Sequence, residues 1–133
     1  MLPSDCETDR GACVPVAFAS ALGAPYHQLR ALFAMLDPGL HLGAGVEHST
    51  VDRVLEYYQS AQITPRPARY CRPSRKARVV DLAARLPSGD YVFMMDTHAF
   101  HLRVVGPRSC VVTPGNRKWL TRTRVRTILQ ILR

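Results

Sequence analysis

A cysteine and a histidine in this chain, each at the start of an apolar segment, form a pair that suits covalent catalysis. Cys13 follows the small residues Gly11 and Ala12 and begins the run CVPVAFASALG, whose apolar spacing predicts a buried helix. The unpaired N–H groups at a helix start favour a negative charge, so we expect Cys13 to have a depressed pKa and to act as a thiolate nucleophile. Its own backbone N–H is a candidate oxyanion donor. The alternative is a thiol packed beneath a neighbouring helix.

The histidine of the pair is His98, which follows a turn signal and precedes residues 99–105, a predicted strand. A histidine held at the mouth of a strand suits the role of general base for a sulfur on a neighbouring helix. The competing histidine, His101, falls on the opposite strand face. Asn116, in the loop after the next strand, is a candidate to hold the imidazole in one tautomer. The alternatives are an ordinary turn histidine and a Pro-Gly-Asn turn residue.

The helices that must position Cys13 come first in the chain. Gly23 is placed as the carboxyl cap of the Cys13 helix, and Pro15 is tolerated only in a first turn, which fixes the helix start close to Cys13. The other predicted helices are residues 26–36, a helix capped by Ser49 or Thr50 that runs to Tyr58, and a helix from Ser74 to about Leu86.

The strands that must position His98 come last. Residues 91–95, 99–105 and 110–113 are short β-branched and aromatic runs separated by turn signals, which predicts an antiparallel meander. Residues 62–74 contain three prolines and are expected to be extended without forming a central strand. The tail, residues 121–133, fits a helix or a last strand, and we favour a helix. Helices followed by strands predict an α+β fold with the Cys13 helix buried against the sheet.

Size and composition exclude several protein classes. With 133 residues, 47% hydrophobic and 21% charged, the chain is expected to form one domain, residues 1–133, rather than a disordered tail. No apolar run reaches the roughly 18 residues of a membrane span. The start has no secretory signal, so we expect a cytoplasmic protein, of a bacterium or of an infected host cell. The 4 cysteines are too few and too scattered for a disulfide scaffold, and the absence of a CxxC pair argues against structural zinc. We expect Cys6, Cys71 and Cys110 to be unpaired, and no cofactor.

Charge is divided unevenly along the chain. Residues 1–60 hold 3 basic and 7 acidic side chains, whereas residues 61–133 hold 15 basic and 3 acidic ones. Such a basic half favours an anionic partner: nucleic acid, an acidic protein surface or a polyanionic substrate. Two basic clusters are expected to converge near Cys13, namely Arg66, Arg69, Arg72, Arg75, Lys76 and Arg78, and Arg117, Lys118, Arg122, Arg124 and Arg126. The alternative is a solvated arginine-rich face.

Three segments resemble the papain-like cysteine peptidases, in particular their small bacterial and phage members. Residues 11–19, GACVPVAFA, resemble the helix that carries the nucleophile, and residues 97–106, THAFHLRVVG, are similar to the histidine strand. Residues 87–92, PSGDYV, are similar to the strand that precedes that histidine. The resemblance covers residues 11 to about 119. It implies a papain-like fold with the nucleophile on the first buried helix and a carboxyl-terminal antiparallel sheet.

Two positions depart from the pattern of that family. The family often has a glutamine some six residues before the cysteine as an oxyanion donor, and Glu7 stands there instead. The family's third catalytic residue, asparagine or aspartate, usually lies at the next strand, where this chain has Thr113. A threonine is poorly suited to orient an imidazole, so we take Asn116 for this role.

The sequence supports two functions of different classes, beside a purely structural subunit. The first is a cysteine peptidase or related thiol hydrolase that cleaves a peptide, isopeptide or other amide bond with Cys13, His98 and Asn116 as catalytic residues. The second is a catalytically inactive papain-like binding module, either an inhibitor or an adaptor for nucleic acid or an acidic partner, that uses its basic half. Neither predicts a membrane partner, and the oligomeric state is left open.

Overall fold

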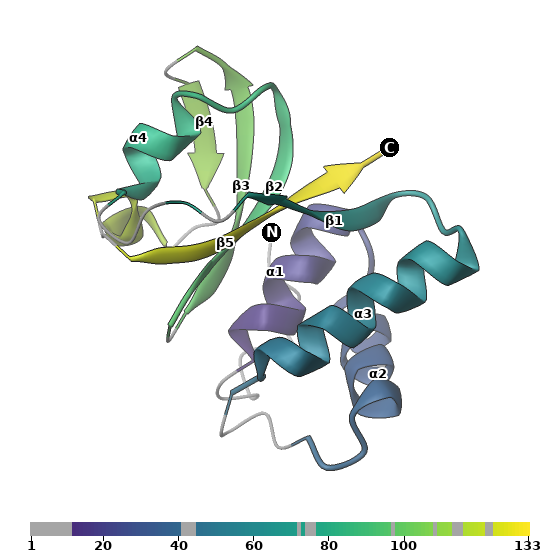
Figure 1. Cartoon of the computed structure of the whole chain (residues 1–133). Coiled ribbons are helices and arrows are strands. Elements are labelled where there is room, and N and C mark those ends of the chain that lie inside the picture. Colours follow the sequence, from purple (N-terminus) through teal and green to yellow (C-terminus); the bar gives the residue numbers. More distant parts are fainter. Residues whose placement is uncertain are drawn as a thin grey trace.

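The computed structural model describes residues 12–40, 45–71, 73, 77–96, 98–107, 109–112, 116–121 and 124–133. The helices are α1 (Cys13–Leu22), α2 (Tyr26–Leu36), α3 (His48–Ala61), α4 (Val79–Ala83) and the short 3-10 helix η3 (Arg117–Thr121). The strands are β1 (Arg66–Cys71), β2 (Gly89–Met95), β3 (Ala99–Gly106), β4 (Ser109–Val112) and β5 (Val125–Leu132). The fold is α+β, as predicted, with three helices packed on a five-stranded antiparallel sheet (Figure 1).

Both faces of the sheet are covered. Helices α1, α2 and α3 gather on one face, and α4 and η3 lie on the other (Figure 1). Strand β2 contributes to both cores, with Val92 and Met94 on the α1 side and Tyr91 and Phe93 on the α4 side. Because successive side chains of a strand point to opposite faces, a strand covered on both faces is apolar throughout. This explains the uninterrupted run YVFMM.

The strand order is β1-β5-β2-β3-β4, so the last strand lies inside the sheet. Strand β5 pairs antiparallel with β1 on one side and with β2 on the other. The prediction of a helix over residues 121–133 is therefore wrong. The spacing of Val125, Ile128, Leu129 and Leu132 fits a helix, but pairing on both sides determines the conformation of this segment, and propensity does not. The predicted meander of β2, β3 and β4 is confirmed.

The helix that carries Cys13 forms as predicted. Gly23 ends α1 in the left-handed conformation, with φ of 70°, and its N–H bonds to the Ala19 carbonyl. Phe18 and Leu22 are buried, with exposures of 0% and 7%. This burial and the packing of α1 on β3 and β2 confirm the expectation that the Cys13 helix is buried against the sheet. Helix α2 also has the predicted bounds.

Two helix starts differ from prediction. Helix α3 begins at His48 with Glu47 as its N-cap, and neither predicted cap is used. Thr50 instead donates to Asp37 Oδ2 at 2.8 Å, which connects α3 to the end of α2. Helix α4 begins at Val79, whereas the predicted start, Ser74, lies outside the described residues. Within the described ranges, no helix is both long and apolar enough to cross a membrane.

Candidate active site

Helix α1 begins at Cys13 and leaves backbone amides without helical acceptors beside the sulfur. The first intrahelical bond runs from the Val16 N–H to the Ala12 carbonyl at 3.0 Å, and no side chain caps the helix. Pro15 in the first turn has no N–H, so the amides of Cys13 and Val14 remain there. Both amides lie within hydrogen-bonding reach of the Cys13 sulfur. The local sequence thus places two N–H donors around the thiol.

The Cys13 thiol is half-buried where α1 packs on the start of β3. The backbone N–H of Ala99, the residue directly after His98, also lies within hydrogen-bonding reach of the sulfur. Burial raises the pKa of the Cys13 thiol above its ordinary value, although the three backbone amides act in the opposite direction. The expectation of a depressed pKa is therefore wrong, because lost hydration outweighs the amides. A neutral thiol needs a base to take its proton.

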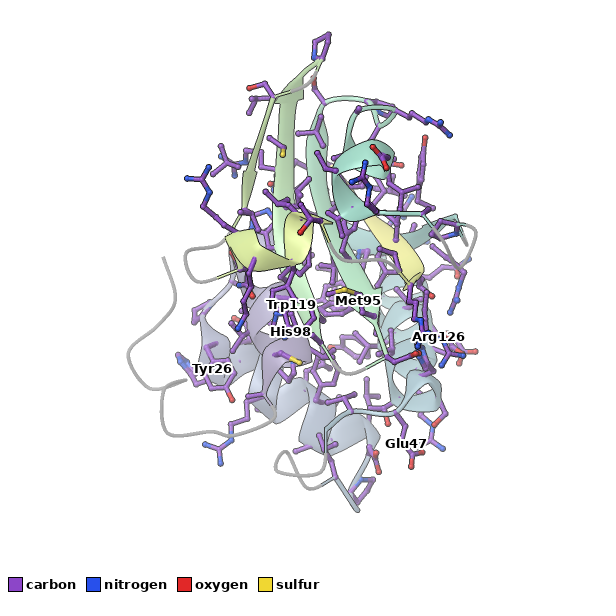
Figure 2. All side chains as sticks on the ribbon, turned by 90° about the vertical axis from the view of Figure 1, so that its left-hand side faces the viewer. Tyr26, Glu47, Met95, His98, Trp119 and Arg126 are labelled. Carbon is purple, nitrogen blue, oxygen red and sulfur yellow. The ribbon has the colours of Figure 1, made fainter. Side chains whose placement is uncertain are left out.

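The imidazole of His98 is held by two neighbours. Its Nε2 lies 2.6 Å from Asn116 Oδ1, and the Trp119 ring stacks on it with centroids 4.5 Å apart and 21° between the planes. Figure 2 shows these two rings beside each other. An amide oxygen only accepts, so His98 donates from Nε2 and keeps the lone pair of Nδ1. Within the described part of the chain, Asn116 is the only hydrogen-bond partner of this ring.

The electrostatic setting keeps His98 neutral at neutral pH. Burial lowers the pKa of His98, the bond to Asn116 opposes this, and the charge of Lys118 lowers it again. The net result is a pKa below the ordinary value of 6.5. A neutral imidazole with an accepting Nδ1 is the state in which histidine acts as a general base.

The three residues selected from the sequence are thus connected by two contacts. His98 and Asn116 are joined by a hydrogen bond, and Cys13 contacts the peptide group that follows His98. Glu7 and Thr113, the two departures from the family pattern, lie outside the described residues. The arrangement combines a thiol near backbone amide donors with a neutral, oriented imidazole on the residue before one of those amides, a set of groups that suits attack on a carbonyl carbon.

Trp119 is a site residue that the sequence reasoning missed. It lies on η3, three residues after Asn116, and it is the only tryptophan of the chain. Its ring covers one face of His98, and the Lys118 ammonium lies 5.7 Å from its centroid. The available signal was a lone aromatic residue three positions after the asparagine. By stacking, Trp119 restricts rotation of the His98 ring and shields it from water.

The competing histidine, His101, lies within β3 and belongs to a separate polar cluster. Its Nδ1 accepts from the Ser20 hydroxyl at 2.7 Å, and its Nε2 donates to Asp90 Oδ1 at 2.7 Å. Asp90 also accepts from Arg103 Nε at 2.9 Å and from the Arg133 guanidinium at 2.8 Å. Burial raises the pKa of Asp90, but these three donors outweigh it and hold the pKa below its ordinary value. We call these five residues the Asp90 cluster.

Among the other cysteines, only the side chain of Cys110 lies within the described residues. Cys110 is a free thiol on β4, as is Cys13 on α1. Cys6 and the side chain of Cys71 fall outside the described residues, so the prediction that they are unpaired stays open. No group of three or more His, Cys, Asp or Glu side chains that could hold a metal occurs among the residues that the structure describes.

The two predicted basic clusters differ in how far their charges are neutralised. In the first, Arg69 pairs with Asp52, and Arg78 pairs with Asp81. In the second, Arg117 and Lys118 are exposed on η3, next to Asn116. The remaining described members are Arg66 on β1, Arg124, and Arg126, which pairs with Asp96. The other members, Arg72, Arg75, Lys76 and Arg122, lie outside the described residues.

Comparisons with known proteins identified no protein similar to this chain. No protein-family model matches the chain, and searches of curated proteins and of solved structures found no match.

Proposed function

We propose that this protein is a thiol hydrolase of the papain-like type, a cysteine peptidase or related enzyme that cleaves a peptide, isopeptide or other amide bond. One observation carries the proposal. His98 is held through Nε2 by Asn116 and through its face by Trp119, so its Nδ1 is the available base, and the residue after it contacts the Cys13 thiol. Cys13 is the nucleophile, His98 the base and acid, and Asn116 the orienting residue.

In the first half of the reaction, the Cys13 sulfur attacks the carbonyl carbon of the substrate while His98 Nδ1 takes the thiol proton. The carbonyl oxygen becomes an oxyanion, for which the backbone N–H of Cys13 at the start of α1 is a donor. His98 then gives its proton to the leaving amine nitrogen, and the carbon–nitrogen bond breaks. The product is an acyl group joined to Cys13 as a thioester.

In the second half, water replaces the amine. His98 Nδ1 takes a proton from water as the oxygen attacks the thioester carbonyl, and the same proton returns to the Cys13 sulfur as it leaves. The bond to Asn116 fixes the ring orientation through both halves. Since both Cys13 and His98 are neutral before the reaction, proton transfer accompanies the attack.

The test is modification and turnover at one thiol. We expect iodoacetamide to label Cys13 faster than Cys110 at neutral pH, and a mixture of peptides and isopeptides to be cleaved. Cys13→Ala abolishes both cleavage and the label at position 13, whereas Cys110→Ala, the matched control on β4, retains them. Equal cleavage by Cys13→Ala would contradict the proposal.

The exposed charges of Arg117 and Lys118 favour an acidic substrate or partner at the same site. A free thiol nucleophile suits a reducing compartment such as the cytoplasm. The same surface supports the second candidate, an inactive binding module for an acidic protein or nucleic acid. The test compares alkylation of Cys13 by anionic iodoacetate and by neutral iodoacetamide. Lys118→Glu reduces the iodoacetate to iodoacetamide rate ratio roughly two- to fourfold at low salt, because the two reagents differ in charge. Arg85→Glu, on the chain between α4 and β2, is the control, and an unchanged ratio in Lys118→Glu would remove the role of this charge.

A further inference from the structure

Helix α1 touches strand β3 through polar groups at two points, and both points lie on one helix face. Ser20 is seven residues after Cys13, which is close to two full turns, so the two side chains project from the same side of α1. Cys13 contacts the Ala99 amide, and Ser20 bonds to His101, two residues further along β3. Two contacts along one line fix how far the helix is rotated about its axis.

The second point of contact belongs to a closed ring of hydrogen bonds. From α1, the Ser20 hydroxyl donates to His101 on β3, and His101 donates to Asp90 on β2. Arg133, directly after β5, donates to Asp90 Oδ2 at 2.8 Å and to the Ala21 carbonyl of α1 at 3.2 Å. The ring thus leaves α1 at Ser20 and returns to it at the next residue, through three strands of the sheet.

The order Ser20–His101–Asp90 has the connectivity of a serine hydrolase, but its surroundings lack what such a site needs. Ser20 lies inside α1, where backbone N–H groups bond within the helix, so no amide donors face its hydroxyl as they face Cys13. Arg103 and Arg133 both donate to Asp90, which compensates the carboxylate charge that a triad uses to stabilise an imidazolium. This ring of hydrogen bonds therefore has a structural role, because it joins α1 to β3, to β2 and to the residue after β5.

We infer that His101, with Ser20 and Asp90, is a positioning residue that fixes the rotation of α1 and thereby the position of the Cys13 sulfur against the Ala99 amide, directly after His98. The catalytic consequence rests on the proposed function, whereas the effect on α1 does not. A side-chain atom roughly 4 Å from a helix axis moves by roughly 1 Å when the helix turns by about 15°. A misplacement of that size costs a catalysed reaction about 100-fold.

The experiment compares two variants that each lose one hydroxyl bond. Ser20→Ala removes the bond to His101, and Thr50→Val, the matched control, removes the bond from Thr50 to Asp37, which joins α3 to the end of α2. For both we measure the melting temperature and the rate of Cys13 alkylation by iodoacetamide across pH. We expect similar losses of melting temperature, but about a tenfold slower alkylation at neutral pH in Ser20→Ala alone. Ser20→Thr, which keeps the hydroxyl, restores the wild-type profile.

A second readout separates this inference from the proposed function. The Ala99 amide resonance reports the contact between α1 and β3 whether or not the protein is a hydrolase. We expect this resonance to move in Ser20→Ala and to stay in place in Thr50→Val. If His98→Gln leaves alkylation unchanged while Ser20→Ala moves the resonance, the proposed function fails and the positioning role stands. If Ser20→Ala and Thr50→Val alter neither the resonance nor the alkylation profile relative to the wild type, the positioning role is wrong.

Discussion

Two histidines lie three residues apart, His98 directly before strand β3 and His101 within it, and their surroundings differ in one decisive respect. His98 bonds to a neutral amide and keeps Nδ1 without a hydrogen-bond partner among the described residues. His101 uses both ring nitrogens, and its acceptor, Asp90, is a buried carboxylate that two arginines also bind. The side chains of His101 and Asp90 are only 12% and 8% exposed. A saturated hydrogen-bond network stabilises a fold, whereas a neutral imidazole with one nitrogen still available can accept a proton.

The largest expected effect concerns His98, the candidate base. If Cys13 and His98 act as proposed, His98→Gln removes the base, and we expect amide hydrolysis to fall about 100- to 10,000-fold while the melting temperature changes little. Kinetics and thermal melts on the same preparation measure both. His101→Gln gives the reverse balance, with the larger loss in melting temperature. Similar hydrolysis rates in His98→Gln and the wild type would show that the two histidines do not divide the roles as described.

The second largest effect concerns Asp90, the acceptor at the centre of the Asp90 cluster. Asp90→Asn removes the buried charge that His101, Arg103 and Arg133 share, and we expect a loss of about 3 kcal/mol in the free energy of unfolding. Asp96→Asn, which breaks an exposed pair with Arg126, costs less than about 1 kcal/mol. Urea unfolding measures both. A comparable cost for the two variants would mean that the Asp90 cluster contributes no more than a surface ion pair.

A smaller effect tests how His98 is oriented. Asn116→Ala removes a hydrogen bond worth about 1 to 2 kcal/mol, which corresponds to roughly 5- to 30-fold in the rate of hydrolysis. Asn116→Asp keeps an acceptor but adds a negative charge, which raises the pKa of His98 and moves the acid limb of the pH–rate profile to higher pH. Profiles of both variants check this. If the acid limb of the Asn116→Asp profile stayed at the wild-type pH, the role of Asn116 as the residue that orients His98 would be contradicted.

The smallest effect lies in the pH dependence of stability, where the two histidines behave alike. Burial lowers the pKa of both below the ordinary value of 6.5, so the unfolded chain takes up protons first as the pH falls. Their contribution is complete above about pH 6.5 and is lost as the pH falls through the folded-state pKa values. Asp90, with its lowered pKa, adds a further loss only below about pH 3.8. Urea midpoints at several pH values measure this, and the His98→Gln, His101→Gln double variant should lack the first loss.

The sequence predicted those parts of the fold whose signals are local. Helices α1 and α2 have the predicted bounds because Pro15, Gly23 and the Asp37-Pro38 step mark their ends within a few residues. Strand β5 was assigned to a helix, since its apolar residues fit both periods once the strand is buried on two faces. Only its pairing with β1 and β2, distant in sequence, decides between them.

The candidate site divides in the same way. Cys13 and His98 were selected from the elements they open, and Asn116 from its place in the following loop. Ser20, Asp90 and Arg133 carry no local signal, because their bonds join residues 81, 43 and 112 positions apart. The raised pKa of Cys13 also depends on burial by distant segments, which a helix-start argument does not include.

Because β5 lies inside the sheet, the structure that surrounds the Cys13 thiol is completed late during synthesis. A ribosome releases Cys13 early and β5 more than one hundred residues later, and until then β1 and β2 have no strand between them. Arg133, which holds both Asp90 and Ala21, emerges after β5. The nascent chain therefore carries Cys13 before the contacts that hold α1 against the completed sheet can form, and these contacts require β5 to be placed between β1 and β2.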